Sequence, residues 1–201
     1  MKIIGITGGV GAGKTKLLGY VEKHYRCRII LADEVAHLLE EPGQKCHMEL
    51  VKLLGEGILN PDGTIDKKRM AEKIFVGGDV LKRVNDIVHP AVKEYILREI
   101  EREKELKESD FLFVEAALLI EDGYDKILDE LWYVHAEPEA RRSRLKEGRA
   151  YSDEKIDGIL KEQLSEEEFR RHCGAVIDNS GSLADACRQI DEKLEEYLCQ
   201  K

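Results

Sequence analysis

A glycine-rich loop between an apolar strand and a helix constrains this chain more than any other feature. The apolar run Lys2–Thr7 precedes the loop, and Lys16–Val21 continue as a predicted helix. This context matters because such a loop works only where a strand leads into a helix N-terminus. A glycine-rich turn that binds nothing is the alternative, and the ordered strand, loop, Lys and Thr disfavour it. The loop fits the pattern GxxxxGK[ST] with Gly8, Gly9, Val10, Gly11, Ala12, Gly13, Lys14 and Thr15.

The chemistry of this loop predicts a bound nucleoside triphosphate with magnesium. Its glycines let the backbone curl, so that successive N–H groups face phosphate oxygens. Lys14 is predicted to reach the β- and γ-phosphates, and the Thr15 hydroxyl to ligate Mg²⁺.

Five short apolar segments indicate buried parallel strands, because near-continuous apolar runs are typical of strands covered on both faces. Helical patterns separate these segments. The alternation predicts an α/β fold of the P-loop nucleoside-triphosphate-hydrolase type, with a doubly wound five-stranded parallel sheet. The segments are Lys2–Thr7, Cys27–Leu31, Phe111–Ala116, Leu131–Ala136 and Ala175–Ile177.

The stretch between the second and third strands is too long for one crossover and reads as helical. We therefore expect a core of residues 1–34 and 109–201, with residues 35–108 inserted as a helical domain. His89-Pro90 is expected to begin the last helix of this insertion, because proline suits the first helical position. The predicted helices are Ala36–Glu40, His47–Leu54, Lys67–Phe75, Val80–Val88 and Pro90–Lys107.

Composition narrows the class of protein. The net charge of −9 argues against a broad basic face for nucleic acid. No apolar run approaches the roughly 20 residues of a membrane helix. The five cysteines are scattered without a CxxC pair, which argues against a zinc site and fits free thiols in a reducing cytoplasm.

Two carboxylates follow predicted strands, at the edge of the sheet where α/β proteins bind ligands. Asp33 comes just after the second strand, and it is a candidate base for a hydroxyl proton or the N-cap of a helix starting at Glu34. Both roles are compatible. Glu115 ends the third strand and is expected in the magnesium shell or against substrate, with a solvent-facing carboxylate as the alternative.

A basic segment after the fourth predicted strand is a third candidate part of the active site. Arg141-Arg142-Ser143-Arg144, with Lys146 and Arg149, is either a cationic clamp for phosphoryl transfer or an exposed helix face.

Together these pieces resemble the dephospho-coenzyme A (dephospho-CoA) kinase family. The similarity runs along almost the whole chain, and the ordered set with His89-Pro90 is more specific than the phosphate loop alone. The matching segments are Gly5–Thr15, Ala32–His37, Glu41–Gly43, Asp62–Asp66, Ile74-Phe75, Ile87–Pro90, Leu118–Glu121, Ile159-Leu160 with Gln163, and Val176–Gly181.

The resemblance implies that ATP phosphorylates the ribose 3′-hydroxyl of dephospho-CoA, giving CoA and ADP. It implies that Asp33 is the base, that the insertion with His89 holds the acceptor, and that Leu118 lies on the substrate side. It further implies a lid at about residues 144–170, carrying Arg144 and Arg149, and an adenine site near Asn179.

Some residues depart from the family pattern. Gly148 stands where an arginine is usual, and Arg149 is the available replacement. Leu31 replaces an aspartate, and Ala117 a proline. The alternatives are another small-molecule P-loop kinase, or a nucleotide-responsive binding protein with impaired turnover. The oligomeric state is not readable from the sequence.

Overall fold

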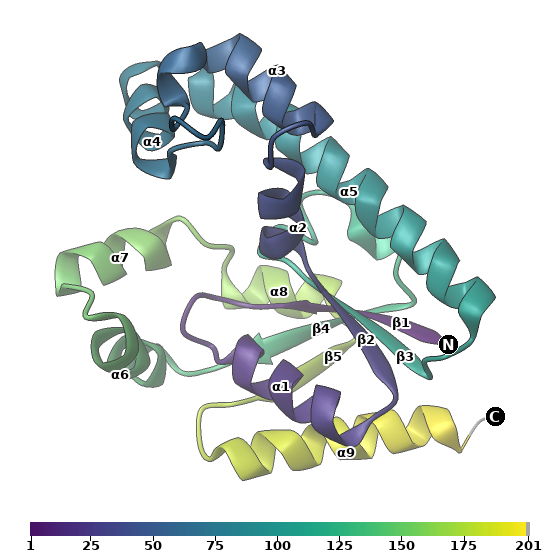
Figure 1. Ribbon diagram of the computed structural model, residues 1–201. Helices are drawn as coiled ribbons and strands as arrows, with labels where there is room; N and C mark the ends of the chain where they lie inside the picture. The colour runs from purple at the N-terminus through teal and green to yellow at the C-terminus, as the bar shows by residue number, and fades with distance from the viewer. Residues whose placement is uncertain (200–201) are drawn as a thin grey trace. The chain divides into compact units, whose positions relative to one another are not determined.

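The structure is a computed structural model that describes residues 1–199, and for Val76 only the backbone. The chain forms two compact units (Figure 1). The first contains Met1–Ile29 and Leu106–Lys201, and the second is Ile30–Glu105. Within residues 1–199, no helix is both long and apolar enough to cross a membrane.

A five-stranded sheet with the order β2-β3-β1-β4-β5 confirms the predicted doubly wound fold. β1 is the central strand and pairs in parallel with β3 and β4, so that Ile6 lies opposite both Glu115 and Trp132. β4 pairs in parallel with β5. The strands are β1 (Lys2–Thr7), β2 (Cys27–Leu31), β3 (Phe111–Glu115), β4 (Glu130–His135) and β5 (Ala175–Asp178).

Helices cover both faces of this sheet, which explains why its strands are continuous apolar runs. α1 and α9 lie side by side along one face (Figure 1), where Tyr20 of α1 donates a 2.8 Å hydrogen bond to Asp191 of α9. On the other face, Phe169 of α8 stacks on Tyr133 with ring centroids 4.6 Å apart. The helices of this unit are α1 (Lys14–His24), α6 (Pro138–Arg149), α7 (Asp153–Lys161), α8 (Glu166–His172) and α9 (Leu183–Leu198), with the 3₁₀ turn η2 (Tyr124–Lys126).

The second unit is helical and has a small core of its own. Leu50, Leu54, Ile58 and Val84 are buried together there. Asp66 is the N-cap of α4, where its carboxylate accepts from the backbone N–H groups of the first turn. The elements are α2 (Ala32–Leu39), α3 (Lys45–Leu54), η1 (Glu56–Ile58), α4 (Lys67–Val76) and α5 (Val80–Leu106).

The expected break before Pro90 was wrong, because α5 is one helix of 27 residues with Pro90 inside it. His89 is therefore an interior helix residue and does not begin a helix. An interior proline costs about 3 kcal/mol, since it removes one hydrogen bond and crowds the preceding turn. Burial offsets this cost, because Val84, Val92, Ile96 and Ile100 of this helix are each buried, and a buried apolar side chain is worth roughly 1.5–3 kcal/mol.

Candidate active site

The phosphate loop joins β1 to α1 in a conformation that depends on glycine. Gly8, Gly11 and Gly13 have φ values of 143°, 84° and 95°, in the range that other residues rarely adopt. A side chain at Gly8 would also overlap the carbonyl of Val134 on β4. Because the N-cap of α1 is Gly13, no side chain caps its first N–H groups. These groups therefore point at the position where a helix N-terminus binds phosphate.

Lys14 is brought together with Glu115, as the pairing of β1 and β3 requires. The Lys14 ammonium donates a 2.8 Å hydrogen bond to the Gly8 carbonyl across the loop. It lies 3.4 Å from the Glu115 carboxylate, and both side chains are mostly buried. A cation and a carboxylate thus meet at the mouth of the loop, next to the predicted phosphate position.

Two side chains from the C-terminal third of the chain hold the far end of the loop. The buried Asn179 amide donates a 2.7 Å hydrogen bond to the Ala12 carbonyl. Arg144 of α6 donates to the Asn179 carbonyl at 2.7 Å, and more weakly to the Ala12 carbonyl at 3.4 Å. Asn179 therefore contacts the loop itself, and Arg144 contacts both the loop and Asn179.

Arg141, which lies in the candidate clamp segment, also contacts the loop, although only Arg144 and Arg149 were singled out there from the sequence. Its Nε donates a 3.0 Å hydrogen bond to the Val10 carbonyl, and its terminal nitrogen donates to the side chain of Gln163. Arg141 and Arg144 are three residues apart, which puts them on one face of α6. That spacing was the available signal within the basic segment.

The rest of the basic segment faces elsewhere. Arg142 pairs with Asp153 at 2.8 Å and with Asp157, both on α7, and α6 and α7 lie side by side (Figure 1). Arg149 is exposed at the end of α6, with its guanidinium 6.0 Å from the ring centre of Tyr151. The neighbouring Arg149 lowers the pKa of the Tyr151 hydroxyl. The described contacts of Arg149 are therefore with Tyr151 and do not include the loop.

The predicted acceptor residues lie in different parts of the chain. Asp33 is exposed in the first turn of α2. The N-cap alternative for Asp33 was wrong, because α2 begins at Ala32 and its N-cap is Leu31. His89 is half-buried within α5, and Leu118 is 38% exposed in the turn after β3.

The donor chemistry near the loop suits magnesium. Thr15 is exposed at the second residue of α1, and the Glu115 carboxylate lies beside Lys14. Both offer the oxygen ligands that Mg²⁺ prefers. Among residues 1–199, no group of three or more His, Cys, Asp or Glu could close around a metal. Nucleotide phosphates and water would therefore have to complete such a site, which is the usual arrangement for Mg²⁺.

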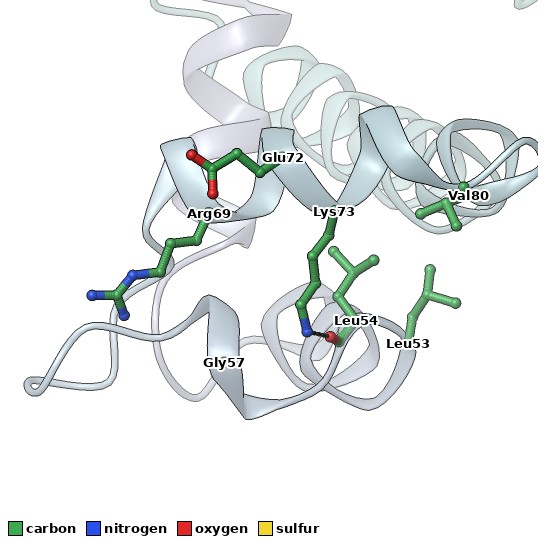
Figure 2. Close-up of a pocket in the computed structure, with 8 residues that line it drawn as sticks. Leu53, Leu54, Gly57, Arg69, Glu72, Lys73 and Val80 are labelled. Carbon is green, nitrogen blue, oxygen red and sulfur yellow. Dashed lines mark hydrogen bonds between the residues drawn. The ribbon is translucent and has the colours of Figure 1, made fainter.

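A surface hollow of about 540 Å³ lies within the second unit, among α3, α4 and the start of α5. Figure 2 shows the Lys73 ammonium donating to the Leu54 carbonyl, in the last turn of α3. Arg69, also on its rim, donates to the Leu59 carbonyl at 2.9 Å. Both cations thus bind backbone carbonyls, and none of the described lining residues belongs to the phosphate loop.

Comparison with known proteins covers both units of the chain. The sequence model of the dephospho-CoA kinase family matches residues 2–185. A dephospho-CoA kinase of Geobacter sulfurreducens is 37% identical over 196 residues, which cover 96% of each chain. One from Aquifex aeolicus is 34% identical over 197 residues, covering 98% of this chain and 97% of the relative. The crystal structure of TT1252 from Thermus thermophilus superposes with a TM-score of 0.80, at 30% identity and 97% coverage of both chains.

Proposed function

Since this chain belongs to the dephospho-CoA kinase family, we propose that its phosphate loop holds ATP while Asp33 prepares the acceptor hydroxyl. The enzyme uses ATP to phosphorylate the ribose 3′-hydroxyl of dephospho-CoA, giving CoA and ADP, which completes CoA biosynthesis. The observation that carries the assignment of the loop is its geometry. Three of its glycines have positive φ, the N-terminus of α1 has no side-chain cap, and the Lys14 ammonium donates to the Gly8 carbonyl.

Lys14 has two roles in the proposed reaction. Its ammonium neutralises phosphate charge on bound ATP, and it keeps that charge positioned as the γ-phosphoryl group leaves. Glu115, 3.4 Å away, orients the ammonium and restrains its movement. The loop N–H groups and the N-terminus of α1 bind the remaining phosphate oxygens.

Thr15 and Glu115 are the residues that would hold Mg²⁺ beside the nucleotide, Glu115 through water. Bound there, the ion would neutralise charge that develops on the phosphate oxygens. The fit rests on oxygen donors at the mouth of the loop and on the expectation that phosphates supply the other ligands.

The acceptor side of the reaction is assigned mainly to the helical unit, with Leu118 contributed by the first unit. Asp33 accepts the proton of the 3′-hydroxyl, supported by its exposed carboxylate directly after β2. His89 on α5 and Leu118 after β3 are proposed contacts of dephospho-CoA, and residues 35–108 form its binding domain. Residues of about 144–170 are proposed to close over ATP as a lid, with Asn179 near the adenine.

A cytoplasmic location belongs to the same proposal. All five cysteines are described and none forms a disulfide. Burial raises the pKa of the Cys27 thiol to about 11, and that of Cys173 to about 12. Such thiols are protonated and unreactive, as structural cysteines in a reducing compartment are.

A coupled assay of ADP release, run with and without dephospho-CoA, tests this function. The proposed kinase releases ADP only when dephospho-CoA is present. Release driven by another small alcohol, with none from dephospho-CoA, would identify a different P-loop kinase. ATP binding without release under any condition would indicate a nucleotide-responsive binding protein instead.

A further inference from the structure

Arg141 holds the phosphate loop from α6 through two hydrogen bonds. Its Nε donates to the Val10 carbonyl at 3.0 Å, and its terminal nitrogen donates to the Gln163 side chain. These partners lie 131 and 22 residues away along the chain. The guanidinium is thus fixed between the loop and the segment that follows α7.

Gly9 provides the space for this guanidinium. A Cβ built on Gly9 would overlap the Arg141 guanidinium and approach the side-chain amide oxygen of Gln163, Oε1, at 2.7 Å. Unlike Gly8, Gly11 and Gly13, Gly9 does not have a positive φ. Gly9 therefore leaves room for the Arg141 guanidinium beside the loop.

The charge of Arg141 is balanced differently from that of its neighbour on α6. Both hydrogen-bond partners of Arg141 are neutral, a backbone carbonyl and an amide side chain. Arg142 instead pairs with the carboxylates of Asp153 and Asp157. Burial lowers the pKa of Arg141, which nevertheless stays charged at neutral pH. A desolvated cation with neutral partners gains most from an incoming anion, and the loop is where phosphate binds.

We propose that Arg141 is the arginine that contacts the transferring phosphoryl group, and that Gln163 is the residue that positions it. The inference rests on the proposed function. In the reaction, the bond from the γ-phosphorus to the β–γ bridging oxygen breaks, and a bond to the acceptor 3′-oxygen forms. The hydroxyl proton passes to Asp33, and ADP leaves. Arg141 forms no covalent bond and donates hydrogen bonds to phosphoryl oxygens, which bidentate guanidinium geometry suits better than an ammonium.

Steady-state kinetics of Arg141→Ala and Arg141→Lys test this role, with Arg142→Lys as the matched control on the same helix. Loss of one preorganised donor costs on the order of 10²–10³ in rate, so kcat of Arg141→Ala should fall by at least about 100-fold. ATP affinity, measured by calorimetric titration, should fall much less, because the contact strengthens in the transition state. Millimolar guanidinium added to Arg141→Ala should restore part of kcat, which a merely structural role would not predict.

Gln163→Met removes the acceptor that holds Arg141 while keeping the side chain's length. Its kcat should fall about tenfold in the wild-type background, a size set by the loss of one charge-assisted hydrogen bond. In the Arg141→Ala background the same change should have no further effect. An equal loss of kcat in both backgrounds would overturn the positioning role of Gln163.

The remaining outcomes separate this inference from the proposed function. If the wild-type chain releases no ADP with dephospho-CoA, the function itself fails, whatever Arg141 does. If the wild type is active and Arg141→Ala keeps its kcat, the Arg141 role is wrong. It is also wrong if kcat falls without guanidinium rescue while melting temperature falls in parallel. A fall in kcat in Arg149→Lys, with none in the Arg141 variants, would assign the phosphoryl contact to the end of α6.

Discussion

Replacing Asn179 with alanine should loosen the far end of the phosphate loop. The Asn179 side chain is 3% exposed and donates a 2.7 Å hydrogen bond to the Ala12 carbonyl. After truncation, that carbonyl keeps only the long contact from Arg144 at 3.4 Å. The amide also lies against Gly13, the N-cap of α1. The substitution therefore removes a fixed point at the start of the helix that receives phosphate.

The expected loss of stability follows from the lost hydrogen bond between Asn179 and the Ala12 carbonyl. A buried acceptor without its partner costs about 1–3 kcal/mol, and the remaining Arg144 contact keeps Asn179→Ala near 2 kcal/mol. In a chain of this length, 1 kcal/mol corresponds to roughly 2–4 °C, so melting should fall by about 4–8 °C. If ATP must reorder the loop at the same cost, its Michaelis constant should rise by about 30-fold.

Urea titration followed by tryptophan fluorescence measures the change in the free energy of unfolding. Trp132 is the only tryptophan, and it is fully buried in β4 of the unit that contains the loop. Asn179→Asp is the size-matched variant, and it should be at least as damaging because a carboxylate cannot donate to the Ala12 carbonyl. An Asn179→Ala protein with unchanged stability and unchanged ATP kinetics would refute the reasoning. Unchanged stability with a large rise in the ATP Michaelis constant would instead favour direct contact with the nucleotide.

Four further outcomes are expected. Lys14→Ala should lower kcat at least about 100-fold, since one such cation is worth on the order of 3–4 kcal/mol in the transition state; wild-type turnover would disprove the ATP site. Asp33→Asn should lower kcat by ~10²–10⁴-fold with ATP affinity unchanged, and retained activity would remove Asp33 as the base. His89→Ala should weaken use of dephospho-CoA but not ATP binding, and calorimetry showing equal acceptor affinity would make His89 structural. The hydrogen bond to Asp191 raises the pKa of Tyr20 to about 12. Because the folded state favours the protonated phenol, Tyr20 stabilises the folded protein fully below about pH 10, and this contribution is lost towards pH 12. Tyr20→Phe should reduce the fall in the free energy of unfolding between about pH 10 and pH 12. An unchanged pH dependence would contradict the contribution of Tyr20.

The sheet was predictable from the sequence because its strands are buried on both faces. Each expected strand lies within one residue of its observed bounds, as for Phe111–Glu115, and the loop was recognisable from its glycines and Lys14. Pro90 misled the prediction, because local propensity marks a helix start there. Burial of Val84 before Pro90, and of Val92 and Ile96 after it, outweighs that local signal.

The contact of Arg141 with the phosphate loop was harder to predict, since its spacing from Arg144 does not show which face of α6 meets the loop. The contact of Arg141 with Val10 joins residues 131 positions apart, and it depends on which side of α6 is turned towards the loop. Glu115 was easier, because the ends of paired parallel strands meet at one edge of the sheet. The pairing of Ile6 with Glu115 carries that carboxylate to the loop.

The central place of β1 also has a consequence for biosynthesis. β1 leaves the ribosome well before its neighbours β3 and β4, which begin at Phe111 and Glu130. An apolar strand must therefore wait for more than half of the chain before either edge can pair, a long-range closure that slows folding. During that wait its unpaired edges are open to aggregation. We expect the nascent chain to depend on chaperones until β4 emerges, and nucleotide binding to begin only after Asn179 has been synthesised.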